Sequence, residues 1–248
     1  MKETLHNYTF TTGEKITVIV KKGSPRRKHI AICITSRGQV VITIPYGVMQ
    51  KDALQIINKK ENWIKHHLIK TLNKPQPSPL TYTTGESHLY LGKRYSLIVL
   101  KEKKSRLSLQ QRIILNKNEI QVTPFSNNSL TVKRLLFKWY YAEAQQYIAK
   151  QLYLLLQQIP WLQTVPTWKI KAMRCCWGSC SPHGVITINT HLIKAPTICI
   201  NYVLLHEIAH LKEHNHSHNY YKLLTKLMPN WINIKTQLEN IAPFVLMS

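Results

Sequence analysis

Acidic side chains are scarce in this chain of 248 residues. Only 11 Asp and Glu residues oppose 34 Lys and Arg residues, which gives a formal net charge of +23, and Asp52 is the only aspartate. A field this positive favours contact with nucleic acid or another polyanion by long-range attraction. The basic residues are nevertheless spread along the chain, with short runs only at Lys21–Lys28 and Lys101–Arg106. The composition therefore fits a solvated basic surface as well as it fits a nucleic-acid partner.

Long apolar runs are also missing. No stretch reaches the roughly 18 uncharged apolar residues that a membrane helix needs. No apolar segment follows Met1-Lys2-Glu3 to form a secretory signal. The 44% of apolar residues suffice for one large domain or two small ones. We therefore expect a cytoplasmic protein with no membrane partner.

Cysteine is limited to five residues, an odd number. In a chain without a secretory signal, reduced thiols are a better expectation than a disulfide framework. Cys175, Cys176 and Cys180 lie close together, but their spacing is not a paired Cys-x-x-Cys and no second pair follows. We expect small buried side chains there rather than a structural metal site.

The residue pattern predicts an α+β protein. A proline-rich break at residues 74–79 separates a β-rich amino-terminal region, 1–74, from the rest of the chain. A small β-rich region, 80–130, and a carboxy-terminal domain, 131–248, come after the break. The strands expected in the first two regions are 29–35, 40–44, 89–91, 95–100, 112–115 and 119–122.

Helical spacing of apolar residues predicts four helices. They cover residues 51–72, 132–158, 197–215 and 217–228, the last of them capped by Ser217. A turn at 36–39 and an alternating strand at Val185–Asn189 complete the expected elements. The aromatic residues of the second helix belong to a core at this spacing, rather than to a surface for stacking bases. They are Trp139, Tyr140, Tyr141 and Tyr147.

Histidines gather near the carboxy terminus. Five of the 12 lie between positions 206 and 218, and His206-Glu207-Ile208-Ala209-His210 matches His-Glu-x-x-His. Residues four apart on a helix share one face, so His206 and His210 can converge on one metal ion. Glu207 then faces the open coordination position, where it takes a proton from a water that attacks a carbonyl. The motif predicts a zinc-dependent peptidase acting on a peptide or protein substrate, with Glu207 as the catalytic base.

A catalytic zinc usually has a third protein ligand. Glu213 and His214 lie roughly 10–12 Å along a straight helix from the first histidine, too far to share the ion. Asn215 favours the left-handed conformation that ends helices, which makes His216 the first histidine able to turn back. The remaining candidates are His218 and, more distant, Glu239.

Together these motifs resemble the YgjP-like metallopeptidases, over nearly the whole chain. In the carboxy-terminal part the likeness rests on Trp177–Ser181, Ile186–Asn189, Tyr202–Leu211 and His214–Ser217. In the amino-terminal part it rests on Arg26-Arg27, Ile44-Pro45, Trp63-Ile64 and Leu91–Tyr95. The chain is similar, more distantly, to SprT-like proteases, some of which act on DNA-bound proteins.

The resemblance implies a zincin-like metallopeptidase fold for the carboxy-terminal domain, with Glu207 as the catalyst. The zinc ligands that it implies are His206, His210 and His216. The family usually has an arginine before the Trp-Gly-Ser-Cys run, where this chain has Cys176. Arg174 is the residue placed to substitute for that arginine.

Several points stay open on the sequence alone. In zincin-type folds a sheet-edge strand beside the metal helix can hold an extended peptide, and Val185–Asn189 is either that strand or an ordinary buried one. The alternatives to a peptidase are a nucleic-acid-associated protein with a structural or degenerate zinc site, and a metal hydrolase of non-peptide substrates. The candidates for stabilising an oxyanion are Tyr220, Tyr221, His218 and Arg174.

Overall fold

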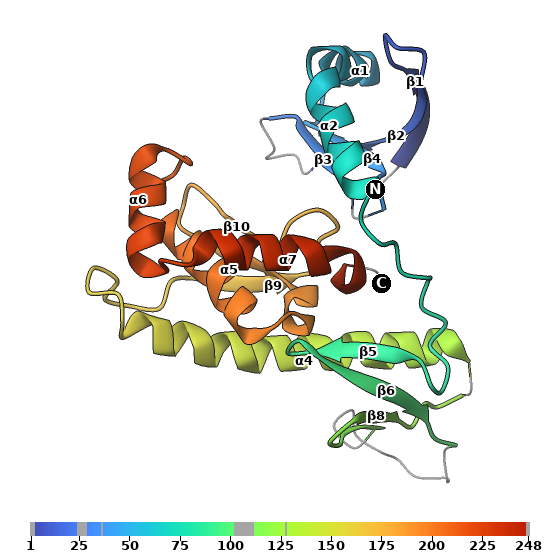
Figure 1. The fold of residues 1–248 in the computed structure, drawn as a ribbon, viewed down its shortest axis with the longest axis vertical. Coiled ribbons are helices and arrows are strands. Elements are labelled where there is room, and N and C mark those ends of the chain that lie inside the picture. Colours follow the sequence, from blue (N-terminus) through green and yellow to red (C-terminus); the bar gives the residue numbers. More distant parts are fainter. Residues whose placement is uncertain (1–2, 24–28, 36, 102–111, 127, 247–248) are drawn as a thin grey trace. The chain divides into compact units, whose positions relative to one another are not determined.

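The computed structural model of the protein describes residues 3–23, 29–35, 37–101, 112–126 and 128–246. Arg26-Arg27, Ser36 of the expected turn and most of both basic runs lie outside the described residues. The chain forms two compact units, Met1–Pro77 and Ser78–Ser248, drawn in blue to teal and in green to red in Figure 1. The predicted α+β fold is confirmed.

The boundary between the two units falls within the proline-rich break. Buried residues from the predicted regions 80–130 and 131–248 share one hydrophobic core, and both regions lie in the second unit. No helix in the described part of the chain combines the length and the apolarity needed to span a membrane.

The amino-terminal unit is a four-stranded sheet of order β1-β2-β4-β3 with two helices packed on an apolar core. The central pair, β2 and β4, is parallel, and the two outer pairs are antiparallel. Its elements are β1 Glu3–Thr9, β2 Lys15–Lys22, β3 Ala31–Ile34, β4 Val40–Ile44, α1 Gln50–Lys59 and α2 Glu61–Leu72. Strands β1 and β2 were not predicted from the sequence.

The single helix predicted over 51–72 is wrong, because the chain breaks it at Lys60 (φ −116°, ψ 14°) into α1 and α2. The break makes Glu61 the first residue of α2, where a carboxylate is favoured by the helix dipole. One oxygen of Glu61 accepts the backbone N–H of Thr11 at 3.0 Å and pairs with Lys65 at 2.8 Å. The buried carboxylate thereby ties the β1–β2 turn to α2.

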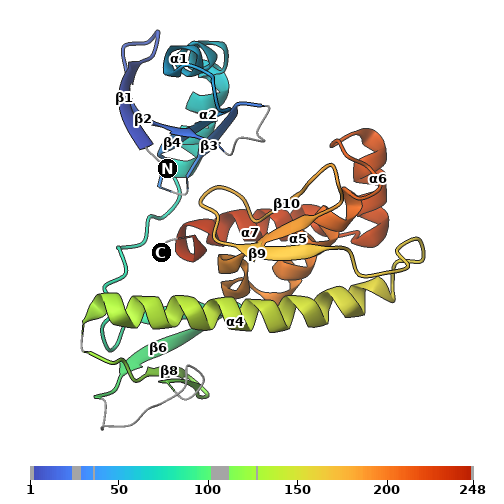
Figure 2. The same ribbon diagram turned by 180° about the vertical axis from the view of Figure 1, so that it is seen from behind.

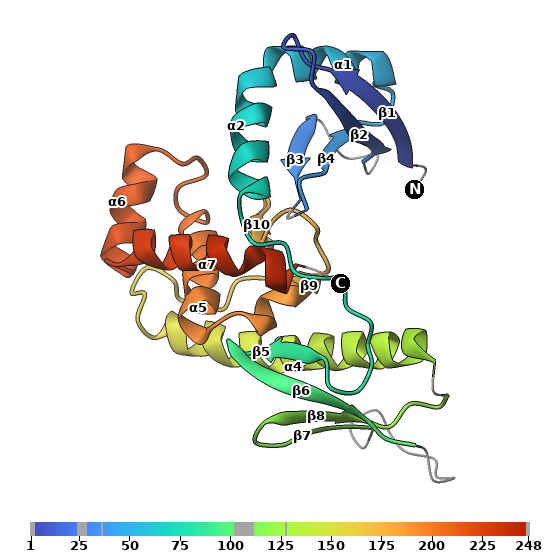
Figure 3. The same ribbon diagram turned by 45° about the vertical axis from the view of Figure 1, so that its right-hand side comes forward.

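The carboxy-terminal unit is organised around one long helix, α4 (Ser129–Leu156). A sheet of order β5-β6-β8-β7 packs along one side of α4 (Figure 3), and the segment that bears the histidines packs along the other (Figure 2). The strands of this sheet are β5 Ser87–Tyr90, β6 Lys93–Val99, β7 Ile113–Leu115 and β8 Glu119–Val122. They overlap all four strands expected for this region.

The aromatic residues of α4 are mostly structural, as predicted. Trp139 and Tyr140 are buried, and the Tyr140 hydroxyl donates to the Leu89 carbonyl of β5 at 2.8 Å. The Tyr147 hydroxyl donates to Thr197 Oγ1 at 2.9 Å and so connects α4 to the segment that bears the histidines. Tyr141 is the exception, because 40% of it is exposed.

The histidine-bearing segment contains a second sheet and three further helices. The sheet has the order β10-β11-β9, with β11 antiparallel to β10 and parallel to β9. Its strands are β9 Trp168–Lys171, β10 Gly178–Cys180 and β11 Ile186–Asn189, and η1 Thr190–Lys194 follows. The helices are α5 Thr197–Ala209, α6 His218–Leu227 and α7 Trp231–Val245, of which α7 was not predicted.

The possibility that Val185–Asn189 is a sheet-edge strand for peptide addition is wrong. β11 is the central strand of its sheet, all four of its residues are buried, and both of its edges are already paired. Within the described part of the chain, the unpaired sheet edge beside α5 belongs to the short strand β10 instead.

Gly92 anchors the turn between β5 and β6 against the start of α5. Its φ is +80°, and a Cβ added there would lie 2.8 Å from Cα of Pro196, the residue that precedes α5. Its N–H donates to the Lys194 carbonyl at 3.1 Å. Only glycine satisfies both the left-handed conformation and the close backbone approach.

We predict that Gly92→Ala lowers the free energy of unfolding by about 2–5 kcal/mol, because backbone strain and steric overlap both contribute. Gly85→Ala is the matched control: Gly85 has φ +91° but nothing within 4 Å of an added Cβ, so only the strain acts. Urea unfolding of the two variants measures the difference. Equal losses would contradict the contact with Pro196.

Candidate metal centre

Helix α5 presents the first two histidines. His206 lies in its last turn and His210 directly follows it as the C-terminal cap. The helix ends at Ala209, six residues earlier than the predicted end near Asn215. The predicted left-handed conformation of Asn215 is also wrong, because the non-glycine residues of positive φ among the described ones are Tyr82 and Leu91.

The early end of α5 lets the chain return. His210 Nδ1 lies 3.0 Å from the Glu213 carbonyl oxygen, a contact in which the ring nitrogen donates. This fixes the tautomer and leaves Nε2 of His210 with its lone pair for a metal ion. Ser217 then starts α6, and its hydroxyl accepts the Tyr220 N–H at 3.3 Å, which confirms the predicted cap. The His210–Glu213 contact and the Ser217 cap therefore fix the backbone before and after His216.

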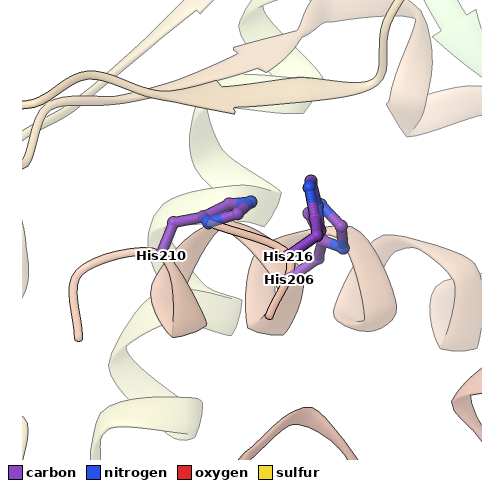
Figure 4. A group of neighbouring side chains, drawn as sticks. All are labelled: His206, His210 and His216. Carbon is purple, nitrogen blue, oxygen red and sulfur yellow. The ribbon is translucent and has the colours of Figure 1, made fainter. Parts of the chain in front are cut away.

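The three imidazole rings point toward one another above α5 (Figure 4). Among the described residues, His206, His210 and His216 form the one group placed to hold a metal ion, with ligand atoms within 4.8 Å of each other. Nε2 of His206 and Nε2 of His216 are 3.2 Å apart. Two nitrogens bound to one tetrahedral ion at about 2.0–2.1 Å lie about 3.3 Å apart, so this pair fits a shared ion.

The other candidate ligands lie outside this group. His218 is exposed at the start of α6 and is not part of the cluster. Glu239 lies on α7, where one of its oxygens is 4.0 Å from Lys235 Nζ. The cysteine cluster does not form a metal group either, among the residues that the structure describes.

The environment of His206 and His216 favours their neutral form, which is the form that binds metal ions. Burial, with smaller contributions from His210, His216 and Lys235, lowers the pKa of His206 to about 3. Burial also lowers the pKa of His216. Nδ1 of His206 is buried and has no hydrogen-bond partner among the residues that the structure describes, so the polar contact of this ring is made at Nε2.

Tyr220 packs against the rings of all three histidines. It is fully buried, its ring stacks on His210 at 4.6 Å, and it meets His216 edge-on at 4.7 Å. Its hydroxyl donates to the backbone carbonyl of His206 at 3.1 Å. This bond engages the hydroxyl hydrogen of a fully buried side chain, which favours a positioning role for Tyr220 over that of an oxyanion donor.

The side chain of Glu207 extends from α5 toward β10, and the residue is 4% exposed. Burial raises the pKa of this carboxyl to about 8. Gly178 of β10 packs directly on it: a Cβ added to Gly178 would lie 2.5 Å from Oε1 of Glu207. Cys180, two residues along the strand, faces the same side, and the Glu207 carboxylate adds to burial in raising the pKa of its thiol. A side chain larger than that of glycine at position 178 would overlap the Glu207 carboxylate, so Gly178 allows this carboxylate to lie where it does.

Asn189 fastens the loop that leads to Gly178. Its side-chain N–H groups donate to the carbonyls of Met173 at 2.7 Å and Cys176 at 2.8 Å. Its side-chain oxygen accepts the N–H of His191 at 3.1 Å and of Met173 at 3.3 Å. Each buried group left unpaired costs about 1–3 kcal/mol, so this amide defines the loop conformation. The role of Asn189 and of Gly178 was not predicted, although both lie in the motifs that carry the family resemblance.

None of the three clustered cysteines is fully buried. Cys175 and Cys180 are partly buried and Cys176 is exposed, and Cys176 and Cys180 are free thiols. The expectation of small buried side chains in this cluster is therefore wrong for Cys176, and Cys175 and Cys180 are only partly buried. Arg174, the proposed substitute for the family's arginine, is exposed in the same loop.

With this geometry in place, comparison with known proteins gives the family. The family described as YgjP-like, metallopeptidase domain, matches residues 28–241. The chain belongs to this family. No curated protein matches it. Among solved structures, it is similar to the crystal structure of the metallopeptidase zymogen of Pyrococcus abyssi abylysin, with 22% identity, a TM-score of 0.34, and coverage of 37% of this chain and 90% of that chain.

We predict that Gly178→Ala in this YgjP-like metallopeptidase reduces hydrolysis about 100-fold, because the new methyl group displaces the Glu207 carboxylate. Metal content per chain should stay at the wild-type value, since no histidine moves. Ser179→Ala is the control, because Ser179 is exposed on the neighbouring position of the same strand. Wild-type activity in Gly178→Ala would show that Glu207 is not held where the structure has it.

Proposed function

We propose that this metallopeptidase is a zinc-dependent peptidase of the His-Glu-x-x-His type. His206, His210 and His216 would bind one zinc ion, and Glu207 would act as the general base. The observation that carries the proposal is the convergence of three imidazoles from two separate segments, next to a buried carboxylate on the same helix.

The donor set supports zinc as the metal. Imidazole suits zinc, copper, iron and nickel, whereas calcium and magnesium prefer oxygen ligands. Three protein ligands with one open position are typical of catalytic zinc sites. When bound, zinc supplies a Lewis acid that polarises a carbonyl and lowers the pKa of a water molecule.

Glu207 supplies the proton transfers. In the metal-free chain, burial raises its pKa to about 8, which favours the protonated acid. A divalent cation beside it favours the carboxylate instead, so a loaded centre gives Glu207 the form needed to accept a proton from water. The same group, once protonated, would then pass the proton to the amine that leaves.

The outer edge of β10 is the place where the substrate backbone would pair. Asn189 N–H donates to Trp177 O at 2.8 Å and Ser181 N–H to Val185 O at 3.0 Å, so alternate residues 177, 179 and 181 bond to β11. The N–H and C=O of Gly178 and Cys180 therefore point to the free edge. An extended peptide added there runs past Glu207.

The test combines zinc analysis with peptide cleavage. We expect about one zinc per chain in wild type and in Glu207→Gln, and sharp loss in His206→Ala, His210→Ala and His216→Ala. His218→Ala is the matched control and should keep its zinc. A mixed peptide library read by mass spectrometry should be cleaved by wild type and not by Glu207→Gln.

Either of two results would contradict the proposal. One is a wild-type chain that holds no zinc under zinc-replete conditions. The other is cleavage that persists in Glu207→Gln at the wild-type rate.

A second candidate rests on the net charge of +23, which favours a polyanionic partner such as nucleic acid. Binding of DNA or RNA that weakens with salt and survives Glu207→Gln would support it. Absence of binding at low salt would rule it out.

A further inference from the structure

A short row of parallel aromatic rings leads away from the third histidine. The Tyr221 ring is 6.0 Å from the His216 ring at 28°, and the Trp231 ring is 5.4 Å from Tyr221 at 15°. His216 precedes α6, Tyr221 lies on α6 and Trp231 begins α7. We call Tyr221 and Trp231 the aromatic shelf.

In the aromatic shelf, a hydrogen bond fixes the Trp231 ring, and the Tyr221 ring is partly exposed. Trp231 Nε1 donates to Thr225 Oγ1 at 3.0 Å, which fixes the indole beneath the phenol ring. Tyr221 nevertheless keeps 39% of its surface exposed, whereas the adjacent Tyr220 is fully buried under the histidines. Tyr220 therefore packs under the histidines, whereas part of the Tyr221 side chain is open to solvent.

A single exposed aromatic residue is ordinary. Tyr221 differs because its ring stacks next to His216, one of the three histidines placed to hold a metal ion. Trp231 stacks on Tyr221 in turn. An extended peptide advances about 3.3 Å per residue. The side chain of a residue next to the scissile bond can therefore reach a ring whose centroid is 6.0 Å from that of His216.

Building on the proposed function, we propose that the aromatic shelf is a specificity subsite for an aromatic or large aliphatic side chain next to the scissile bond. Stacking on a ring that is held flat favours such a side chain over a small one. Tyr221 and Trp231 are then specificity-determining residues of this peptidase.

The test uses two zinc-binding probes, N-acetylphenylalanine hydroxamate and N-acetylalanine hydroxamate, with calorimetry on the zinc-loaded chain. Wild type should bind the phenylalanine probe roughly tenfold more tightly, because only that side chain covers the shelf. Tyr221→Ala and Trp231→Ala should reduce this ratio to about threefold or less, with zinc content and affinity for the alanine probe unchanged. Tyr221→Phe should keep the ratio, since the ring is retained.

Tyr153→Ala is the matched control, because Tyr153 is an exposed tyrosine on α4 (59%) outside the aromatic shelf. Equal binding of the two probes to wild type would overturn the proposal, as would a preference that survives both alanine variants. Loss of zinc and of both probes in Tyr221→Ala would make Tyr221 a support for His216 and would also overturn it. If wild type binds zinc and both probes equally, only the subsite fails; if it binds neither zinc nor probe, the zinc centre fails as well.

Discussion

The metal centre depends on where helix α5 ends. A straight continuation would carry the chain away from His206, and no later histidine could return. The helix stops at Ala209, and the contact between His210 Nδ1 and the Glu213 carbonyl closes the turn. His216 then comes back to within 3.2 Å of His206, nitrogen to nitrogen. The same contact selects the His210 tautomer, so one backbone carbonyl contributes to both the shape of the turn and the chemistry of the ligand.

Buried polar and aromatic groups fix the positions of the residues around that turn. Tyr220 lies under the three imidazoles and bonds to the backbone of α5. On the other side of the helix, Asn189 fastens the loop before β10, and Gly178 gives Glu207 room. These contacts explain how the Glu207 carboxylate can be 4% exposed and still have a defined position. Preorganisation of this kind is what proton transfer at a defined distance requires.

Local signals in the sequence predicted which histidines come together. The His-Glu-x-x-His spacing, the Ser217 cap and the proline-rich break each depend on a few neighbouring residues, and each has a counterpart in the structure. Features that depend on distant pairing were not predictable in this way. The central position of β11 follows from its pairing with both β9 and β10, which no alternation pattern reveals.

Weak local patterns account for the other differences. β1 buries none of its residues fully, and Leu5 points outward with 72% exposure, so β1 lacks the apolar alternation that indicates a strand. The break at Lys60 has no proline or glycine to mark it, and depends instead on the contact between Glu61 and the distant Thr11. Gly178 and Asn189 were visible in the sequence as motif residues, but their roles needed the packing of β10 against α5.

The central claim is that three imidazole nitrogens share one zinc ion. X-ray absorption spectroscopy at the zinc edge of the loaded wild-type chain tests it most directly, because nitrogen and sulfur ligands differ in bond length. We expect three imidazole ligands and one or two oxygen ligands at about 2.0–2.1 Å, and one imidazole fewer in His216→Ala. A ligand shell containing sulfur at about 2.3 Å, or a spectrum unchanged in His216→Ala, would contradict it.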